Sequence, residues 1–270
     1  MFSKIAELVK QGKPLTHIPF IDFHGHLGNS SLYYSLPRIR PEQIKSYLRC
    51  FGIDHFMCFS LCIDSDPTVG NMLQYKFAAD DPQLFSTLTL LHAAFPQDWA
   101  SIIEEGEKAN TRGLKLIPAY QGVDELSIDW TAAFDQIAEK QYVVLNHSWG
   151  NSEKLAFYAR TYPKIKFIVG HSSVDYVDVI DKYDNVYQCT CACSVANCFP
   201  SFEKLVNCLP KERILFGSDA LDLDVGMELG PVALSDVPEE TKELILGRNA
   251  LRLIKELGWN VGDWVSFYDC

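Results

Sequence analysis

Two histidines separated by one residue, His24 and His26, lie at the end of an apolar segment that begins at residue 21. Side chains of an extended strand alternate between its two faces, so these histidines are predicted to point the same way, roughly 6.5–7 Å apart. Both imidazoles could then bind one metal ion. The motif alone is short, and two unrelated surface histidines at a strand end would explain it equally well.

The same alternation assigns the other residues of this strand to a face. Asp22 shares the parity of the two histidines, whereas Ile21 and Phe23 are predicted to face the opposite side, where helices could cover them. Gly25 and Gly28 leave the backbone free to turn where the strand ends.

Further side chains that could bind a metal or move a proton stand at the ends of later apolar segments. These are Lys115 in the fourth segment, His147 after the fifth, His171 after the sixth and Asp219 after the eighth. Each alone has an ordinary explanation as a solvated lysine, a buried or loop histidine, or a helix cap. Taken with the first two histidines, they form a suitable ligand set for Zn²⁺ or a similar divalent ion.

The composition limits the partners of the chain. Of its 270 residues, 24 are Lys or Arg and 35 are Asp or Glu, which gives a net charge of −11, and no basic cluster interrupts it. Nucleic acids and anionic membranes are therefore not expected as partners, and a small-molecule substrate fits better. The sequence leaves open whether chains associate into a homo-oligomer.

Cysteine usage and the N-terminus indicate the compartment. Four of the nine cysteines crowd into residues 189–198, which is unlike a disulfide framework and predicts a reducing cytoplasm. Charged residues interrupt the apolar positions of residues 1–12, which predicts a short amphipathic helix in place of a signal peptide. No apolar run approaches the roughly 18 residues of a membrane span.

One pattern repeats along the chain: a short apolar segment rich in β-forming residues, a polar loop, and a segment with helical period. The predicted strands cover residues 21–28, 53–60, 84–91, 112–117, 142–146, 165–169, 186–191 and 214–216. The predicted helices cover residues 41–51, 69–80, 98–108, 129–140, a segment starting at 152, 175–183, 202–208, 238–246 and 248–257.

Strands that are apolar on both faces and alternate with helices require a parallel sheet covered by helices. The sequence therefore predicts an α/β fold, a closed (β/α)8 TIM barrel in one domain over residues 1–270, with its site at the carboxyl ends of the strands. An open doubly wound sheet is the alternative. The first βα turn lacks the Gly-x-Gly-x-x-Gly fingerprint that often accompanies that alternative.

The sequence resembles the amidohydrolase superfamily. Within that superfamily it resembles the amidohydrolase-related branch, which includes aminocarboxymuconate semialdehyde decarboxylase-like enzymes and several hydrolases. The resemblance covers nearly the whole chain. Its motifs are Ile-Asp-Phe-His-Gly-His at 21–26, Gly-Leu-Lys-Leu-Ile-Pro at 113–118, the histidines at 147 and 171, Leu-Phe-Gly-Ser-Asp at 215–219, and Ile-Leu-Gly-Arg-Asn-Ala at 245–250. The chain departs from the branch at residues 171–173, His-Ser-Ser, where a glycine-rich turn is more usual.

The resemblance implies a metal held by four residues, namely His24, His26, His147 and Asp219. His171 would bind a second metal or act on the substrate. In the two-metal members a lysine at the end of the fourth strand is carboxylated and bridges both ions, which makes Lys115 a further metal-site candidate. The resemblance therefore implies one or two divalent ions, Zn²⁺ first and Mn²⁺ as an alternative, and it does not decide between them.

The expected chemistry follows from such a ligand set. Zn²⁺ lowers the pKa of a bound water to about 7 and polarises a carbonyl oxygen. Asp219 would be the general base, and His171 would stabilise negative charge that develops on the substrate. The main hypothesis is a metal-dependent hydrolase of a cyclic amide, lactone or ester, and the alternative is a non-oxidative decarboxylase of an unsaturated or aromatic carboxylic acid. A barrel that binds a metal without turnover is a third hypothesis.

Two further sets of residues have an open role. Candidates for substrate contact are the residues that follow predicted strands, namely Tyr33, Tyr34, Arg38, Arg40, Tyr120 and Trp149, although ordinary loop positions explain them at least as well. Cys189, Cys191 and Cys193 would share one face of a strand, near the metal site or among the covering helices. For these cysteines we expect a structural role as small buried apolar residues, without a metal role.

Overall fold

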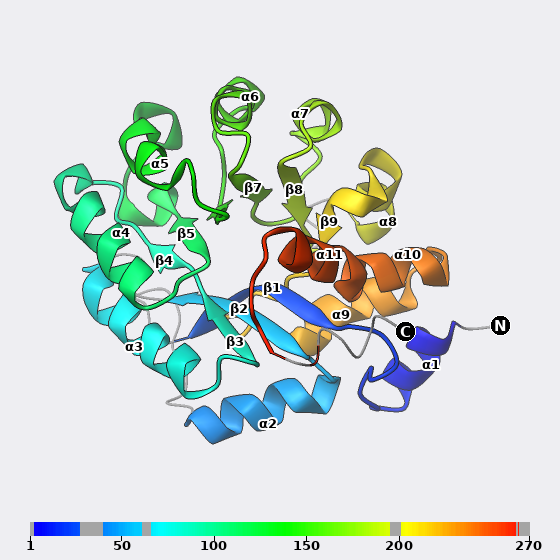
Figure 1. The fold of residues 1–270 in the computed structure, drawn as a ribbon. Coiled ribbons are helices and arrows are strands. Elements are labelled where there is room, and N and C mark those ends of the chain that lie inside the picture. The colour runs from blue at the N-terminus through cyan, green and yellow to red at the C-terminus, as the bar shows by residue number, and fades with distance from the viewer. Residues whose placement is uncertain (1–2, 28–39, 61–65, 195–200, 263, 265–270) are drawn as a thin grey trace.

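Parallel strands form the centre of the molecule, and helices surround them (Figure 1). The computed structural model describes residues 3–27, 40–60, 66–194, 201–262 and 264. The strands are β1 Ile21–Leu27, β2 His55–Ser60, β3 Phe85–Thr87, β4 Thr89–Leu90, β5 Gly113–Leu116, β6 Val143–Asn146, β7 Lys166–Val169, β8 Val186–Cys189 and β9 Ile214–Leu215.

The helices follow the strands in alternation, as the sequence predicts. They are α1 Lys4–Lys10, α2 Pro41–Phe51, α3 Pro67–Asp80, α4 Trp99–Lys108, α5 Thr131–Ile137, α6 Ser152–Thr161, α7 Val177–Lys182, α8 Phe202–Cys208, α9 Val225–Leu234, α10 Glu239–Glu243 and α11 Asn249–Glu256. A π-helical turn, Leu244–Arg248, joins α10 to α11. Among the described residues, none of these helices has the length and apolar character needed to cross a bilayer.

The strand order runs around a barrel. One set of neighbours is β1-β2-β3 and the other is β4-β5-β6-β7-β8-β9, all parallel. β3 and β4 are one strand interrupted at Leu88, whose amide donates to the Cys58 carbonyl of β2 over 2.9 Å. At the other seam, the Phe23 amide donates to the Phe216 carbonyl over 2.9 Å. The prediction of a (β/α)8 barrel is confirmed.

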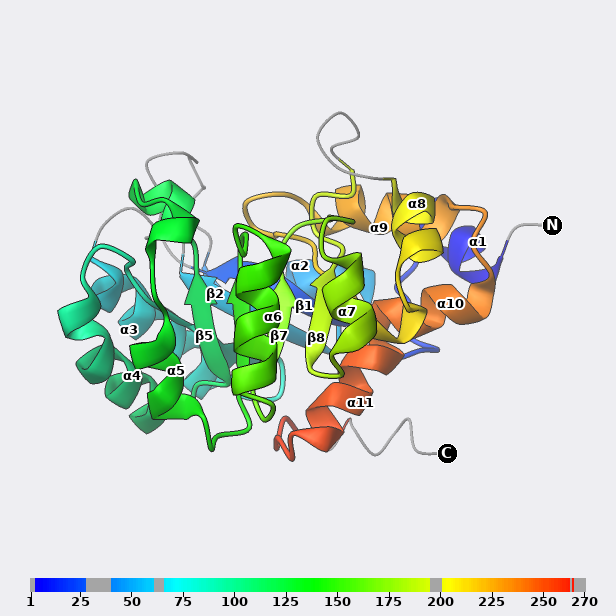
Figure 2. The ribbon, with the colours of Figure 1, turned by 90° about the horizontal axis from the view of Figure 1, so that it is seen from above.

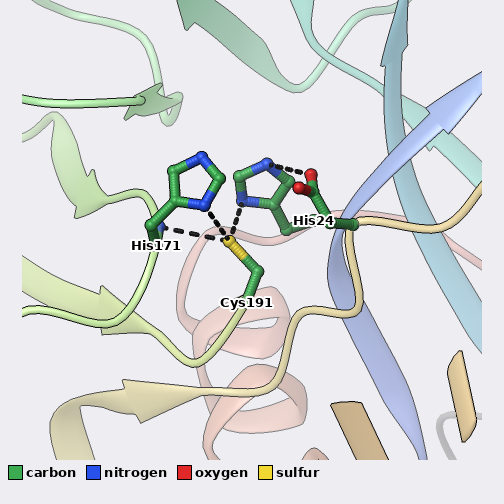
Figure 3. Close-up of side chains that lie close together, drawn as sticks. His24, His171 and Cys191 are labelled. Atoms are coloured by element: carbon green, nitrogen blue, oxygen red, sulfur yellow. Dashed lines mark hydrogen bonds and ion pairs between the residues drawn. The ribbon is translucent and has the colours of Figure 1, made fainter. Parts of the chain in front are cut away.

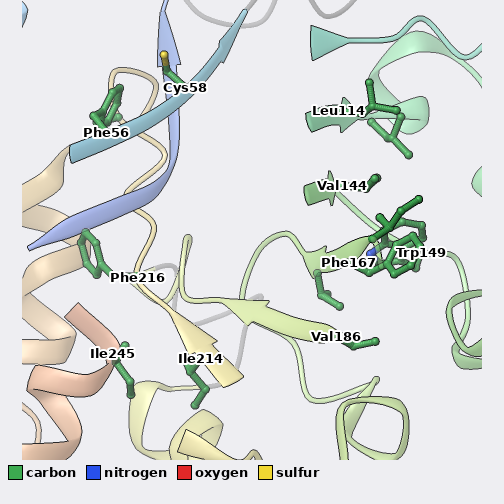
Figure 4. Close-up of a cluster of buried hydrophobic side chains, with 14 of the residues drawn as sticks. Phe56, Cys58, Leu114, Val144, Trp149, Phe167, Val186, Ile214, Phe216 and Ile245 are labelled. Atoms are coloured by element: carbon green, nitrogen blue, oxygen red, sulfur yellow. The ribbon is translucent and has the colours of Figure 1, made fainter. Parts of the chain in front are cut away.

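Both faces of the strands are apolar because two separate cores flank them. Phe56, Val144 and Phe167 face outward and pack under the helices (Figure 4). The alternate residues, such as Met57 and Leu145, fill the barrel interior together with side chains of α11. This double burial explains why the strands appear in the sequence as continuous apolar runs.

The C-terminal segment covers the end of the barrel where the strands begin, as Figure 2 shows for α11. The Trp259 indole donates to the Gln141 carbonyl over 2.9 Å, just before β6. Arg112, just before β5, donates to the Asn260 carbonyl over 3.0 Å. The opposite end, where the strands finish, is left for the loops that carry the polar residues.

β1 departs from the strict alternation that the sequence predicts. Its pairing with β2 shifts register between Asp22 and Gly25. Phe23 therefore faces the barrel interior, where its ring stacks on Trp259 at 6.3 Å, and His26 faces the interior as well. The prediction that Ile21 and Phe23 lie under the covering helices is wrong, because the irregularity lets residues of opposite parity share one face.

Candidate metal centre

One carboxylate oxygen joins the two histidines of β1. Asp219 Oδ1 lies 3.0 Å from His24 Nε2 and 2.7 Å from His26 Nε2. All three side chains are buried, and the Phe59 ring lies beneath both imidazoles, with centroids 5.0 and 4.4 Å away. Ligand atoms that share an ion about 2.0–2.2 Å away lie roughly 3 Å from one another, so this arrangement fits a divalent ion.

Backbone contacts between β1 and the segment after β9 place Asp219. Its amide donates to the His24 carbonyl over 2.7 Å. The preceding residue, Ser218, donates its amide to Asp22 Oδ1 over 3.1 Å, and this oxygen also accepts from the His24 amide over 3.1 Å. Asp22 thus supports the site from behind and is not among the groups of donors that could hold an ion.

Two residues of the site adopt a left-handed backbone. The φ angle is 58° at Asp219 and 59° at His171. Such a conformation costs of order 1 kcal/mol for a residue other than glycine, and it is found mainly where the surrounding structure imposes it at functional sites. His171 lies two residues after β7 and Asp219 lies four residues after β9, and both side chains belong to the same group of candidate donors.

His147 and His171 form a second histidine pair at the mouth. His171 Nε2 lies 2.6 Å from His147 Nδ1, and the His171 ring lies 5.5 Å from the His24 ring. The Tyr120 ring lies 4.8 Å from that of His147. His147 therefore lies beside His171, and His171 is the member of this pair whose ring lies next to His24.

Sulfur enters the site in a way that the sequence does not predict. Cys191 Sγ lies 3.3 Å from His24 Nδ1 and 3.4 Å from His171 Nδ1 (Figure 3). Cys189 Sγ is farther, at 3.7 Å from His24 Nδ1, and the Cys193 thiol contacts the Ser172 hydroxyl. The burial of all three is confirmed. The common face holds for Cys189 and Cys191, which both lie in the barrel interior beside His24, and fails for Cys193, which packs in the core under the helices because the alternation stops after β8 ends at Cys189.

The Lys115 side chain projects into the same space. Its Nζ is fully buried 4.3 Å above the Phe59 ring, and among the described residues it has no hydrogen-bond partner. Burial lowers the pKa of Lys115 to about 8. An amine without a partner, buried beside a candidate metal centre, is consistent with the role in the site that the sequence suggests for it.

His147, His171 and Asp219 hold the charge states that a cation requires, whereas the pKa of His24 is raised, because Asp219 more than offsets the effects of burial and Lys115 on it. Burial, reinforced by Lys115, lowers the pKa of His147 to about 3, and burial together with His147 holds the pKa of His171 well below its usual value. Burial alone would raise the pKa of Asp219, but His24 and His26 more than offset it and hold that pKa well below its usual range. Neutral imidazoles and an ionised carboxylate are the forms that bind metals.

Within the part of the chain that the structure describes, two overlapping groups of donors could hold an ion. One comprises His24, His171, Cys191 and Asp219, and the other comprises His26, Asp219 and Asp222, with donor atoms within 4.8 Å of one another. Asp222 is not a sequence-predicted site residue. Its Oδ1 is buried without a partner among the described residues, and burial, with Asp219 adding to it, raises the pKa of Asp222 to about 7.

The structure places the predicted substrate-contact residues in different environments. Trp149 is fully buried in the core under the helices, where its indole donates to the Ile168 carbonyl over 3.2 Å, so its prediction as a contact is wrong. Tyr120 lies beside His147, and Arg40 is exposed at the start of α2. Three other candidates lie outside the described residues: Tyr33, Tyr34 and Arg38.

Comparisons with known proteins agree with this architecture. A family model described as amidohydrolase matches residues 71–255, more than half of the chain. A TIM-barrel protein from Bordetella bronchiseptica has a TM-score of 0.72 at 14% identity, covering 90% of this chain and 100% of that chain. Comparison with curated protein sequences gives no match.

Two further similar structures are decarboxylases. The 5-carboxyvanillate decarboxylase of Novosphingobium aromaticivorans, complexed with manganese and 4-hydroxy-3-methoxy-5-nitrobenzoic acid, has a TM-score of 0.68 at 11% identity, covering 90% of this chain and 98% of that chain. The 2,6-dihydroxybenzoate decarboxylase from Rhizobium has a TM-score of 0.64 at 11% identity, covering 90% and 99%. At these identities the similarity shows the fold alone.

Proposed function

Because the chain belongs to the amidohydrolase family, we propose that it is a metal-dependent enzyme that decarboxylates a small unsaturated or aromatic carboxylic acid without an oxidant. The observation that carries the proposal is the convergence of His24 and His26 on one oxygen of Asp219 at the mouth of the barrel. Solved decarboxylases with the same fold, one of them holding manganese, support this choice over hydrolysis.

The proposed metal ligands are His24, His26 and Asp219, with His171 and His147 adjacent to them. We propose Zn²⁺ or Mn²⁺ as the ion, since imidazole suits zinc and a carboxylate also suits manganese. When bound there, a divalent ion would act as a Lewis acid that polarises an oxygen of the substrate. Whether Lys115 carries a carboxylate and whether a second ion is held remain parts of the proposal to be tested.

The side chains of the protein must then bind the substrate and supply a proton to the product. Decarboxylation breaks the bond between the carboxyl carbon and its neighbour, releases CO₂, and leaves an electron pair that takes up one proton. Asp222 can hold that proton near neutral pH, since the pKa of this side chain is raised to about 7 beside Asp219. Phe59, which is buried beside both β1 histidines, would help to keep water away from a substrate carbon bound there.

Hydrolysis of a lactone, ester or cyclic amide is the second candidate. It is favoured by the position of Asp219, whose ionised carboxylate lies beside the two β1 histidines and can accept a proton from a water held there. In that reaction Asp219 would accept a proton from the attacking water and His171 would stabilise the developing negative charge. The same residues serve both candidates, so only turnover separates them.

The test is a panel of aromatic and unsaturated carboxylic acids, lactones and esters, assayed with protein reconstituted with Zn²⁺ or Mn²⁺. Decarboxylation should release one CO₂ per product, place solvent deuterium on the product carbon, and leave the organic product without ¹⁸O from labelled water. Incorporation of ¹⁸O would establish hydrolysis instead. Activity should disappear with a chelator and return with metal, and metal-loaded protein that turns over neither class would contradict both candidates.

The proposal also covers the partners and the cellular location of the enzyme. We propose a small-molecule substrate and no nucleic-acid or membrane partner, because the net charge is −11 without a basic cluster. We also propose a cytoplasmic location, for which the support is the cysteine usage. Localisation of the tagged protein in cells would test the second point.

A further inference from the structure

The sulfur of Cys191 lies between two histidines that come from different strands (Figure 3). Three nitrogens surround it: His24 Nδ1 at 3.3 Å, His171 Nδ1 at 3.4 Å and the His171 backbone amide at 3.2 Å. The Cys191 side chain is fully buried. A sulfur in this position can accept several N–H hydrogen bonds at once.

The two nitrogens of each ring have separate partners. His24 directs Nε2 to Asp219 and Nδ1 to Cys191. His171 directs Nε2 to His147 and Nδ1 to Cys191. Since a neutral imidazole has one N–H and one lone pair, the group that accepts from Nδ1–H determines that the lone pair is on Nε2.

We propose that Cys191 is a positioning residue whose sulfur accepts the Nδ1–H hydrogen bonds of His24 and His171. When an ion is bound, this would hold His24 in the tautomer whose Nε2 lone pair faces the metal. In most metal sites a carboxylate, a backbone carbonyl or a water does this for a histidine ligand. The inference rests on the proposed function to the extent that His24 is taken as a metal ligand.

The geometry favours this role over direct metal binding by Cys191. The sulfur lies beside Nδ1 of His24, whereas Asp219 and the proposed ion lie beside Nε2 of the same ring. Cys189 is a weaker acceptor because its sulfur is 3.7 Å from His24 Nδ1. Among the described cysteines, Cys191 is the one that contacts both rings.

The first test compares metal affinity in three variants by competition with a chelator of known affinity. Cys191→Ala should weaken the affinity for Zn²⁺ or Mn²⁺ about 10–100-fold, the usual loss when a partner of a metal-binding histidine is removed. Cys191→Ser keeps an acceptor and should recover part of this loss. Cys58→Ala is the matched control, because Cys58 is an equally buried free thiol that bonds to the Ser86 carbonyl away from the site.

The second test needs no metal. Nitrogen NMR of the metal-free protein labelled at its histidines should show His171, whose Nε2 faces His147 and not a carboxylate, with its proton on Nδ1 in the wild type and in Cys58→Ala. In Cys191→Ala the same ring should become a mixture of tautomers. Cys191→Ser should retain a majority of the Nδ1–H form.

These measurements separate the failure of the inference from that of the proposed function. A wild-type protein that binds no metal would contradict the proposed function, and the NMR result would still decide the role of Cys191. Unchanged affinity and tautomer in Cys191→Ala would overturn the inference. A thiolate-to-cobalt charge-transfer band in the Co²⁺ protein that is lost in Cys191→Ser would also overturn it, because Cys191 would then bind the metal directly.

Discussion

Asp219 Oδ1 is the atom at which the chemistry of the proposed site converges. Both β1 histidines lie against this oxygen, and together they hold the pKa of its carboxyl well below the usual range. In water such a cluster of imidazoles and a carboxylate would be weakly coupled, but here burial removes the solvent that would screen it. Changes at single residues of this cluster should therefore affect metal binding and turnover separately.

Replacing either β1 histidine should empty the metal site. His24→Ala or His26→Ala removes one ligand, and the residues that remain cannot complete four- or five-coordinate geometry. Metal analysis after dialysis should give less than one ion per folded chain. His17→Ala is the control, because His17 precedes β1 outside the groups of candidate donors and its loss should leave the metal content unchanged. Full occupancy in both β1 variants would disprove the ligand assignment.

Asp219→Asn tests the hydrolysis candidate, in which Asp219 accepts the proton of the attacking water. Asn tolerates the left-handed backbone at this position and keeps an oxygen that can bind the ion, so the fold and most of the metal should be retained, unlike in the alanine variants of the histidines. Loss of the ionised carboxylate should lower turnover by roughly 10²–10⁴-fold, the usual contribution of general acid–base catalysis. The assay is kcat at measured metal occupancy. Turnover close to that of the wild type at full occupancy would move the proton-transfer role to His171.

At the scale of elements, two departures from regular patterns shape the protein. The register shift in β1 brings Phe23 and His26 to the same interior, one toward each end of the barrel. Helix α9 is absent from the predicted elements, because Gly226, Gly230 and Pro231 oppose a helix in isolation. It forms because Asp224 caps its amides and its apolar side chains find burial against the barrel.

The contact between β2 and the start of β3 predicts a pH-dependent stability. His55 is fully buried, with Nδ1 2.8 Å from the Gln83 carbonyl and Nε2 2.9 Å from the Ser86 hydroxyl. Burial lowers the pKa of His55 from 6.5 to about 4. Between these two values the unfolded chain binds more protons than the folded one, so the free energy of unfolding falls as the pH decreases from 6.5 to 4.

Over that pH window, His55 is expected to change the free energy of unfolding by about 3 kcal/mol. Urea unfolding of the wild type and of His55→Gln at pH 7 and at pH 4.5 measures it, because glutamine does not titrate. The stability advantage of the wild type should shrink at the lower pH. An advantage that stays constant between the two pH values would show that His55 is not held neutral by burial.

The whole molecule separates stability from chemistry along the barrel axis. Helix α11 lies at the end where the strands begin (Figure 2). The histidines and Asp219 occupy the end where the strands finish. This is the usual division in such barrels. Mutations at the two ends should therefore have different signatures.

Trp259→Ala tests this division. The Trp259 side chain is 8% exposed, stacks on Phe23 and donates to the Gln141 carbonyl, so its loss should cost about 3–5 kcal/mol of unfolding free energy. Metal affinity measured on the folded fraction should stay within a factor of two. Phe157→Ala, an exposed aromatic on α6, should change the stability by less than about 1 kcal/mol. A parallel loss of metal affinity in Trp259→Ala would show that the two ends are coupled.

The sequence by itself determined the strand order and the end of the barrel at which the polar residues lie. Apolar runs of three to eight residues, each followed by a polar loop, are local signals, and in a parallel barrel each strand delivers its last residues to the same mouth. His24, His26 and Asp219 meet there for that reason. The contacts among these three residues follow from the barrel topology, which the alternation of strands and helices in the sequence already implies.

Only the tertiary structure decided which further side chains enter the site. Cys191 follows the last residue of β8, so its direction depends on the turn after the strand and on the His171 loop it contacts. Asp222 reaches the site through a loop without a repeating pattern, and Trp149 turns under the helices although it lies only two residues after His147. Beyond the end of a strand the period of two no longer applies, and long-range packing sets where each side chain points.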